Sequence, residues 1–370
     1  MKLNLTRRHM LLASAIAGAG IAFPRTAFAT GQNKRFVFVL QRGAADGLSL
    51  VQPHGDPALR QLRARLVDED ALPLDGFFAL HPALTQTAQM FAAGEAQAWH
   101  AVATRYRRRS HFDAQNVLES GNPQPYASRT GWLGRLLPLL PGTPSPLALS
   151  AAVPLTLRGQ MPVGTYAPSR LPDPSEDLLN RVAALYGEDA QLGPLWEEAM
   201  RTRMVASDIG DNAGRGGQQV GELASSLMMA EGGPRVMMVE TGGWDTHQAQ
   251  PGRLNTQLRG LDALLGALRD GLGDAWSDTL VLVATEFGRT AAVNGSLGTD
   301  HGTASAALLL GGALPAGDKV VADWPGLGSS QLYQNRDLRP TGDLLALATS
   351  AVVDHFGVDR DRALAALASV

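Results

Sequence analysis

Two short Asp-His clusters in this sequence lie beside glycines. "GGWDTH" contains Asp245 and His247, and "GTDHGT" contains Asp300 and His301. Ligands two residues apart can reach one cation only where the backbone is irregular, and the glycine pair before Trp244 permits this. Neutral imidazole and carboxylate, without sulfur, suit zinc, manganese or iron better than calcium. Together the two clusters predict a site for a divalent metal.

Other carboxylates occur in similar surroundings. Asp46 lies in "RGAADG", where the glycines allow a tight turn, and Glu286 lies in "TEFGRT". Asp-Gly is also one of the commonest turn dipeptides, so Asp46 taken alone favours a simple turn. Taken together, the predicted metal ligands are Asp46, Asp245, His247, Glu286, Asp300 and His301. Asp300 is predicted to bind the ion directly or to orient another ligand.

The segment "RRRSHFDAQ" places a hydroxyl next to an imidazole. Ser110 is expected to be the N-cap of a helix that begins near residue 112. A helix N-terminus also attracts anions, so the same serine is a candidate nucleophile; the two interpretations are compatible. His111 is a candidate acid or base, and Arg42, Arg109 and Arg289 are candidate contacts for a substrate anion. The run of Arg105, Arg107 and Arg108 predicts a solvated face instead.

These residues follow segments that are typical of buried parallel strands. Continuous apolar runs occupy 36–40, 96–106, 235–245 and 279–290, and a further run lies at 304–312. Helical periodicity occurs at 253–272 and over about 175–230, with an interruption near "DIGDNAGRGG". Strands that alternate with helices predict an α/β fold with a mainly parallel sheet. Ligands bind beyond the carboxyl ends of such strands, where the polar residues lie.

The N-terminal 29 residues are predicted to be an export signal. Lys2, Arg7 and Arg8 precede an apolar stretch from Met10 to Phe23, and "AFA" at 27–29 offers a cleavage site. The arginine pair is similar to a twin-arginine signal, while a general secretion signal or an uncleaved anchor is the alternative. Residues 30–370 are then expected to form one domain in the periplasm or outside the cell. We expect no membrane span after the signal is removed.

Composition narrows the classes of partner. Without the four basic residues of the signal, 28 basic residues remain against 35 acidic ones, a net charge of −7. An acidic chain of this kind is unsuited to phosphate contacts, so no nucleic-acid partner is expected. The chain has no cysteine, which excludes disulfides and thiolate metal sites. A small anionic ester is the expected substrate, a protein partner is the alternative, and nothing in the sequence gives the oligomeric state.

The ordered motifs resemble a known family. "RGAADGL", "HPAL", "SHFDAQ", "GWLGR", "GGWDTH", "TEFGRT", "GTDHG" and "DWPGL" are similar to DUF1501, a family of exported bacterial proteins, across the whole mature chain. Ala44 stands where the family usually has glycine. That family in turn resembles the alkaline phosphatase/sulfatase superfamily. The resemblance implies a three-layer α/β/α sandwich with metal ligands on loops after the strands.

The superfamily resemblance also implies roles for particular residues. Asp46 is similar to the superfamily's first metal-binding Asp, and Ser110 to its nucleophile. Asp245 with His247 resembles an Asp…His pair, Glu286 the Asp of an Asp-His pair, and His301 the last ligand. Phe287 stands where that second pair requires a histidine. The number of metal ions, one or two, therefore stays open.

Two functional hypotheses follow. The first is an exported metal-dependent hydrolase of phosphate or sulfate esters, with zinc or manganese as the preferred metal. The second is an exported binding or assembly protein that keeps the fold and at most one metal. Two departures from the superfamily pattern favour the second hypothesis. Phe287 replaces a ligand, and the spacing between Asp245 and His247 is shorter than the usual one.

Overall fold

The computed structural model describes residues 33–142, 144–167, 176–186, 189, 192–207, 216–314 and 316–369. The predicted export signal at 1–29 lies outside these residues. Among the helices that are described, none is both long and apolar enough to cross a membrane.

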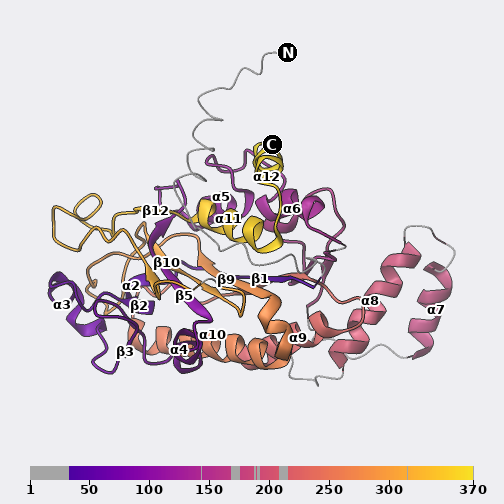
Figure 1. Ribbon diagram of the computed structural model, residues 1–370, viewed down its shortest axis with the longest axis horizontal. Helices are drawn as coiled ribbons and strands as arrows, with labels where there is room; N and C mark the ends of the chain where they lie inside the picture. The colour runs from indigo at the N-terminus through magenta and orange to yellow at the C-terminus, as the bar shows by residue number, and fades with distance from the viewer. Residues whose placement is uncertain are drawn as a thin grey trace, which may run out of the picture.

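A large, mainly parallel sheet forms the centre of the protein (Figure 1). β1 (Arg35–Gln41) lies in its middle, between β9 (Thr279–Thr285) and β8 (Val236–Thr241), and runs parallel to both. The full order is β11-β5-β10-β9-β1-β8-β6-β7, with β12 paired to β5. The remaining strands are β5 (Ala96–Ala103), β6 (Leu147–Leu149), β7 (Gly164–Thr165), β10 (Ser305–Leu310), β11 (Val320–Val321) and β12 (Gly342–Asp343).

The direction of β10 decides which loops meet. β10 is antiparallel to both of its neighbours, β5 and β9, whereas the other strand pairs described in this sheet are parallel. The start of β10 therefore lies at the same edge as the carboxyl ends of β1, β5, β8 and β9. As a result, the loop before β10 joins the loops after the other strands.

Helices cover both faces of the sheet (Figure 1). On one face lie α4 (Thr85–Ala92), α9 (Gly217–Met229) and α10 (Gln250–Leu272). The other face is covered by α5 (His111–Ser120), α6 (Trp132–Leu136), α11 (Leu344–Phe356) and α12 (Arg360–Ala368). The predicted three-layer α/β/α sandwich is therefore confirmed.

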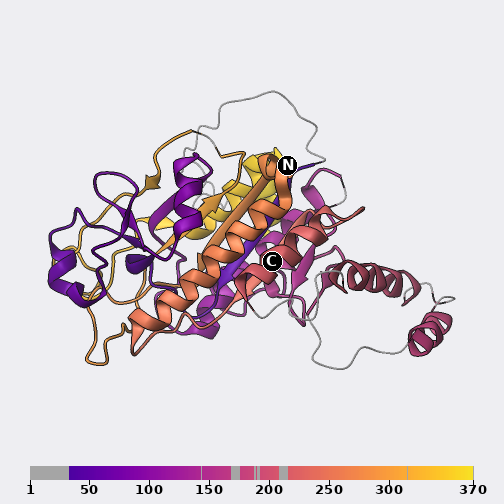
Figure 2. The same cartoon turned by 90° about the horizontal axis from the view of Figure 1, so that it is seen from below.

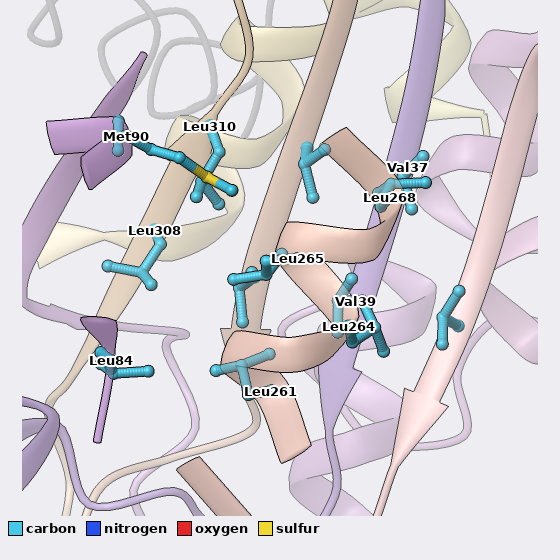
Figure 3. Close-up of a cluster of buried hydrophobic side chains, with 14 of the residues drawn as sticks. Val37, Val39, Leu84, Met90, Leu261, Leu264, Leu265, Leu268, Leu308 and Leu310 are labelled. Carbon is cyan, nitrogen blue, oxygen red and sulfur yellow. The ribbon is translucent and has the colours of Figure 1, made fainter. Parts of the chain in front are cut away.

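The continuous apolar run of β1 is explained by these two helical layers. Val37 and Val39 belong to the core cluster under α9 and α10, while Phe36, Phe38 and Leu40 belong to the cluster on the opposite face. A strand buried on both faces needs apolar residues at every position. Figure 3 shows the first cluster, in which four leucines of α10 point at the sheet: Leu261, Leu264, Leu265 and Leu268.

The remaining elements are peripheral. α7 (Glu176–Tyr186) and α8 (Leu192–Ser207) lie to one side of the layers, beyond α9 (Figure 2). A small antiparallel sheet contains β2 (Val51–Gln52), β3 (Leu72–Pro73) and β4 (Ala79–Leu80). Two short helices, α2 (Gly47–Leu50) and α3 (Ala58–Arg63), flank β2 in the sequence. Single 3-10 turns occur at Ala64–Leu66, Leu137–Leu139 and Leu155–Leu157, and a longer 3-10 segment at Gly273–Asp278.

Candidate metal centre

Three imidazoles and one carboxylate converge at this edge of the sheet. The Nε2 atom of His301 lies 2.9 Å from Nε2 of His111 and 3.0 Å from Nε2 of His247. It also lies 3.3 Å from Oδ1 of Asp245, and His247 Nε2 is 3.0 Å from the same oxygen. Ligand atoms of His111, Asp245 and His301 all lie within 4.8 Å of one another. His247 is not part of this group of three, but its Nε2 atom lies beside two of the members, His301 and Asp245.

The second ring nitrogen of each histidine has its own acceptor. Nδ1 of His111 lies 2.7 Å from Glu286 Oε1, and Nδ1 of His247 lies 3.1 Å from Asp300 Oδ1. Nδ1 of His301 lies 2.9 Å from the carbonyl oxygen of Arg109. Because ionised carboxylates and a backbone carbonyl can only accept, each neutral ring carries its proton on Nδ1 and leaves a lone pair on Nε2. All three lone pairs therefore belong to the nitrogens that converge.

This donor set fits a divalent metal. Ligand atoms of a tetrahedral zinc site, about 2.0–2.1 Å from the ion, lie about 3.3 Å apart, close to the distances found here. Histidines that bind metals characteristically donate their other N–H to a carboxylate or a backbone carbonyl, as all three do in this protein. Three imidazoles and one carboxylate suit zinc or manganese.

Three separate segments carry the donors. His111 is the first residue of α5, Asp245 and His247 follow β8, and His301 precedes β10. Gly43, with φ of +120°, passes so close to this loop that a Cβ there would lie 2.8 Å from the backbone nitrogen of Asp245. Only glycine permits both this conformation and this approach.

Phe287 supports a histidine rather than replacing one. Its ring stacks on His111, with 4.9 Å between centroids and 30° between planes. The side chain is buried with Tyr106, Ala114 and Val117. The residue that cannot bind a metal therefore forms an apolar wall against the His111 ring.

The structure does not bring Asp46 into the cluster. Both carboxylate oxygens accept from Arg63 Nη1, at 3.0 and 3.1 Å, and Oδ2 also accepts from Ser49 and Gln250. The side chains of Asp46 and Arg63 are each 1% exposed. Burial alone would raise the pKa of Asp46, but the charge and hydrogen bonds of Arg63 hold it below its ordinary value. The cation that pairs with Asp46 in this structure is the guanidinium of Arg63.

Glu286 is placed behind the cluster instead of in it. Its side chain is fully buried, and Oε1 accepts from His111, from the backbone N–H of Gly43 and from Gln115. Oε2 accepts from the hydroxyl of Thr285. With both oxygens engaged by protein groups, Glu286 orients His111 in this structure. Asp300 has the corresponding place beside His247, which selects the second of its two predicted roles.

The arginines predicted to contact an anion are engaged by protein groups. Arg289 is buried and donates to Asp245 Oδ1 at 2.6 Å and to the hydroxyl and carbonyl of Thr299. Arg109 donates to Asp337 Oδ2 through two nitrogens. Arg42 is paired with Glu119 and Glu240. The structure thus makes Arg289 a support for Asp245, and Arg109 a support for His301 through its carbonyl.

Charge in the cluster is unevenly distributed. The hydrogen bond that His111 donates to Glu286 raises the pKa of His111, although burial opposes this shift. Burial lowers the pKa of His301, and the nearby His111 lowers it further. Burial would raise the pKa of Asp245, but Arg289 holds it below its ordinary value. The centre therefore combines an ionised carboxylate with a neutral His301, which is the protonation state that a metal requires.

Ser110 lies directly beside the cluster. It occupies the N-cap position of α5, yet its hydroxyl bonds to none of the helix N–H groups. It interacts instead with the side chain of Tyr106, whose hydroxyl donates to Asp113 Oδ2 at 2.9 Å. The predicted N-cap position is correct, while the capping hydrogen bond is absent. The serine hydroxyl remains available at the start of the helix that carries His111.

Comparison with known proteins identifies the family. Residues 33–365 match DUF1501, described as a protein of unknown function. The chain belongs to the DUF1501 family. No match was found among curated proteins.

Several solved structures are similar to this DUF1501 protein. One is the C-terminal periplasmic domain of EptC from Escherichia coli in complex with zinc, at 10% identity and TM-score 0.42, covering 90% of this chain and 85% of that one. Another is an alkaline phosphatase superfamily protein from Vibrio parahaemolyticus, at 14% identity and TM-score 0.38, covering 84% and 70%. A third is the phosphonate monoester hydrolase of Agrobacterium radiobacter, at 12% identity and TM-score 0.38, covering 88% and 74%.

Some residues of this DUF1501 site were not predicted from the sequence. Gln250 bonds to Asp46 through Nε2 and accepts from Thr299 through Oε1, so it connects the buried ion pair to the Arg289–Asp245 pair. Tyr106, which interacts with Ser110, donates its hydroxyl to Asp113. Gln250 begins a helix with an ordinary amphipathic pattern, so no sequence signal marks it.

Proposed function

We propose that this DUF1501 protein is a metal-dependent hydrolase of phosphate or sulfate esters with a single divalent ion. His111, His247, His301 and Asp245 hold the ion, and zinc or manganese suits this set. The observation that carries the proposal is the convergence of three Nε2 atoms and one carboxylate oxygen, each histidine being oriented by its own acceptor. One ion is expected because Arg63 neutralises Asp46 and Phe287 occupies the other predicted ligand position.

Each residue then has a defined task. A bound divalent metal supplies Lewis-acid polarisation of the ester and lowers the pKa of a nearby hydroxyl. Ser110 is the candidate nucleophile, and it interacts with Tyr106, which Asp113 holds in place at the start of α5. Glu286, Asp300 and the Arg109 carbonyl fix the three rings, and Arg289 fixes Asp245. His111, a predicted acid or base, becomes a ligand in this arrangement.

Export belongs to the same proposal. The predicted twin-arginine signal would carry the folded protein to the periplasm or beyond, which allows a metal to be bound before export. A fusion of residues 1–32 to a reporter, with Arg7 and Arg8 both replaced by Lys, tests the route. Export that persists after this double substitution would contradict the twin-arginine assignment.

A binding or assembly role is the second candidate. It is favoured by the pairing of Arg42, Arg109 and Arg289 with carboxylates, which leaves none of these three to bind a substrate anion. In that case the metal would stabilise the site without turnover.

Turnover of aryl esters separates the two candidates. Purified protein loaded with zinc or manganese is assayed with an aryl phosphate and an aryl sulfate, beside Ser110→Ala and the control Ser277→Ala on an exposed turn. The hydrolase proposal expects turnover that Ser110→Ala reduces by about 100-fold or more while metal content is unchanged. Metal-loaded protein that hydrolyses neither ester would contradict the hydrolase and leave the binding role.

A further inference from the structure

The segment 105–112 contains six charged or aromatic side chains besides Ser110 and His111, and its four arginines differ in their partners. Arg105 pairs with Asp343 at 3.4 Å, Arg107 donates to the carbonyls of Thr104 and Tyr106, and Arg109 is bound to Asp337. Arg108 is exposed and, in the described part of the chain, has no hydrogen bond or ion pair. Among the four arginines of this segment, Arg108 is therefore the one whose guanidinium has no partner in the described part of the chain.

The backbone places Arg108 close to the centre. The carbonyl of the next residue, Arg109, lies 2.9 Å from Nδ1 of His301, so the chain touches the cluster one residue after Arg108. Arg109 has φ of +61°, a left-handed conformation that turns the chain at this point. Ser110 and His111 follow at once. Arg108 therefore lies two residues before Ser110 and three before His111, on the loop that touches the cluster.

Phe112 follows the ligand His111 and is conspicuously unburied. Its side chain is 79% exposed, which is more than for any other large hydrophobic residue in the described ranges. Exposed phenylalanine leaves apolar area in water that a ligand can cover. Tyr126, 64% exposed, lies near the same helix turn, because its backbone N–H donates to Asn116 and its hydroxyl interacts with Asp113. Two exposed aromatic rings therefore border the start of α5.

We propose that Arg108 and Phe112 are the residues that determine substrate specificity. Arg108 binds the anionic group of the ester, and Phe112 packs against its organic group. The substrate class is then an anionic ester with an apolar or ring-shaped organic group. This inference rests on the proposed hydrolase site, and it explains how an anion is recognised although Arg42, Arg109 and Arg289 are paired.

Anion binding without turnover tests the role of Arg108. Inorganic phosphate and sulfate are titrated into metal-loaded full-length protein by calorimetry, at constant ionic strength, for the wild type, Arg108→Ala and Arg105→Ala. Arg105 is the matched control because it is an exposed arginine of the same run with a protein partner. We expect Arg108→Ala to weaken anion binding about 10-fold and Arg105→Ala to change it by less than about 2-fold. Equal effects, or no anion binding by the wild type, would overturn the inference.

A phenyl ester tests Phe112. The ratio of affinities for phenyl phosphate and inorganic phosphate is compared among the wild type, Phe112→Ala and Met229→Ala, the last being an exposed apolar residue on α9. We expect Phe112→Ala to lower this ratio by about 3- to 10-fold and Met229→Ala to leave it unchanged. An unchanged ratio in Phe112→Ala would remove this residue from the proposal. If Arg108-dependent anion binding is found without ester hydrolysis, the hydrolase proposal fails while anion recognition stands. If esters are hydrolysed and Arg108→Ala does not change the rate, the hydrolase proposal stands and the role of Arg108 fails.

Discussion

Two carboxylates of this protein have similar sequence surroundings and opposite environments. Asp46 and Asp245 each follow a central strand of the sheet and a glycine-containing turn. Asp46 is buried, and Arg63, Ser49 and Gln250 occupy its oxygens. Asp245 is partly exposed, and three imidazole nitrogens lie near it. Both carboxylates accept from a buried arginine, Arg63 or Arg289, so the difference lies in the imidazole nitrogens that surround Asp245 alone and make its surroundings the candidate metal site.

Hydrogen bonds connect the two regions, but substitutions in them are expected to have different effects. The path runs from Asp46 to Gln250, then to Thr299, and through Arg289 to Asp245. A substitution in the buried Asp46–Arg63 pair should lower folding stability, because it leaves a charge without a partner. A substitution among the histidines of the candidate metal centre should lower metal affinity and leave the stability of the metal-free protein largely unchanged.

The largest effect is expected from Asp46→Asn. The substitution leaves the Arg63 guanidinium buried without its counter-charge, so the free energy of unfolding should fall by about 3–5 kcal/mol. Urea unfolding of chelator-treated protein measures this, with Asp274→Asn on an exposed turn as the control. A variant that keeps its stability but loses a bound metal would show that Asp46 is a ligand after all.

Removal of a ligand is the next test. His301→Ala should weaken metal binding by about 100-fold or more, because this imidazole is the donor nearest to all the others. Competition with a chelating dye measures the affinity, and His54→Ala, outside the cluster, is the control. An affinity equal to that of the wild type would contradict the proposed centre.

A smaller loss is expected when a support is changed and the ligands stay. Glu286→Gln removes the negative charge that orients His111, and metal affinity should fall by about 10-fold. The exposed Glu69→Gln serves as control in the same dye competition. A fall as large as that of His301→Ala would indicate that Glu286 binds the ion directly.

The smallest effect concerns pH and the buried region. Burial lowers the pKa of His100 from 6.5 to about 4, and its ring bonds to the carbonyl of Val51 and the N–H of Ala101. Because the unfolded chain binds the proton more readily, stability is complete above pH 6.5 and declines as the pH falls toward 4. Between pH 6.5 and 5.5 this group should account for about 1 kcal/mol of lost stability.

The variant His100→Gln checks this pH dependence. The decline in the free energy of unfolding over that interval should be about 1 kcal/mol smaller than in the wild type. Identical pH profiles in urea unfolding would mean that His100 does not titrate as its burial indicates.

The sequence predicted the strands well because burial on both faces demands unbroken apolar runs, as in β1 and β9. It did not reveal the direction of β10, since an apolar run looks the same in either direction. That direction brings His301 to the edge where Asp245 lies.

The composition of the centre was predicted in part. Asp245, His247 and His301 are marked by glycine-rich loops, which are local signals. The partner of Asp46 is Arg63, seventeen residues away, and that of His111 is Glu286, 175 residues away. Such pairings depend on how helices and loops pack, so the sequence could not separate the ligands from the residues that orient them.

The number of metal ions per chain tests the central claim most directly. Elemental analysis of the purified protein, together with His301→Ala and Asp46→Asn, gives this number. We predict one zinc or manganese ion per chain in the wild type and in Asp46→Asn, and none in His301→Ala. Two ions in the wild type, or one that is lost with Asp46→Asn and retained with His301→Ala, would contradict the account.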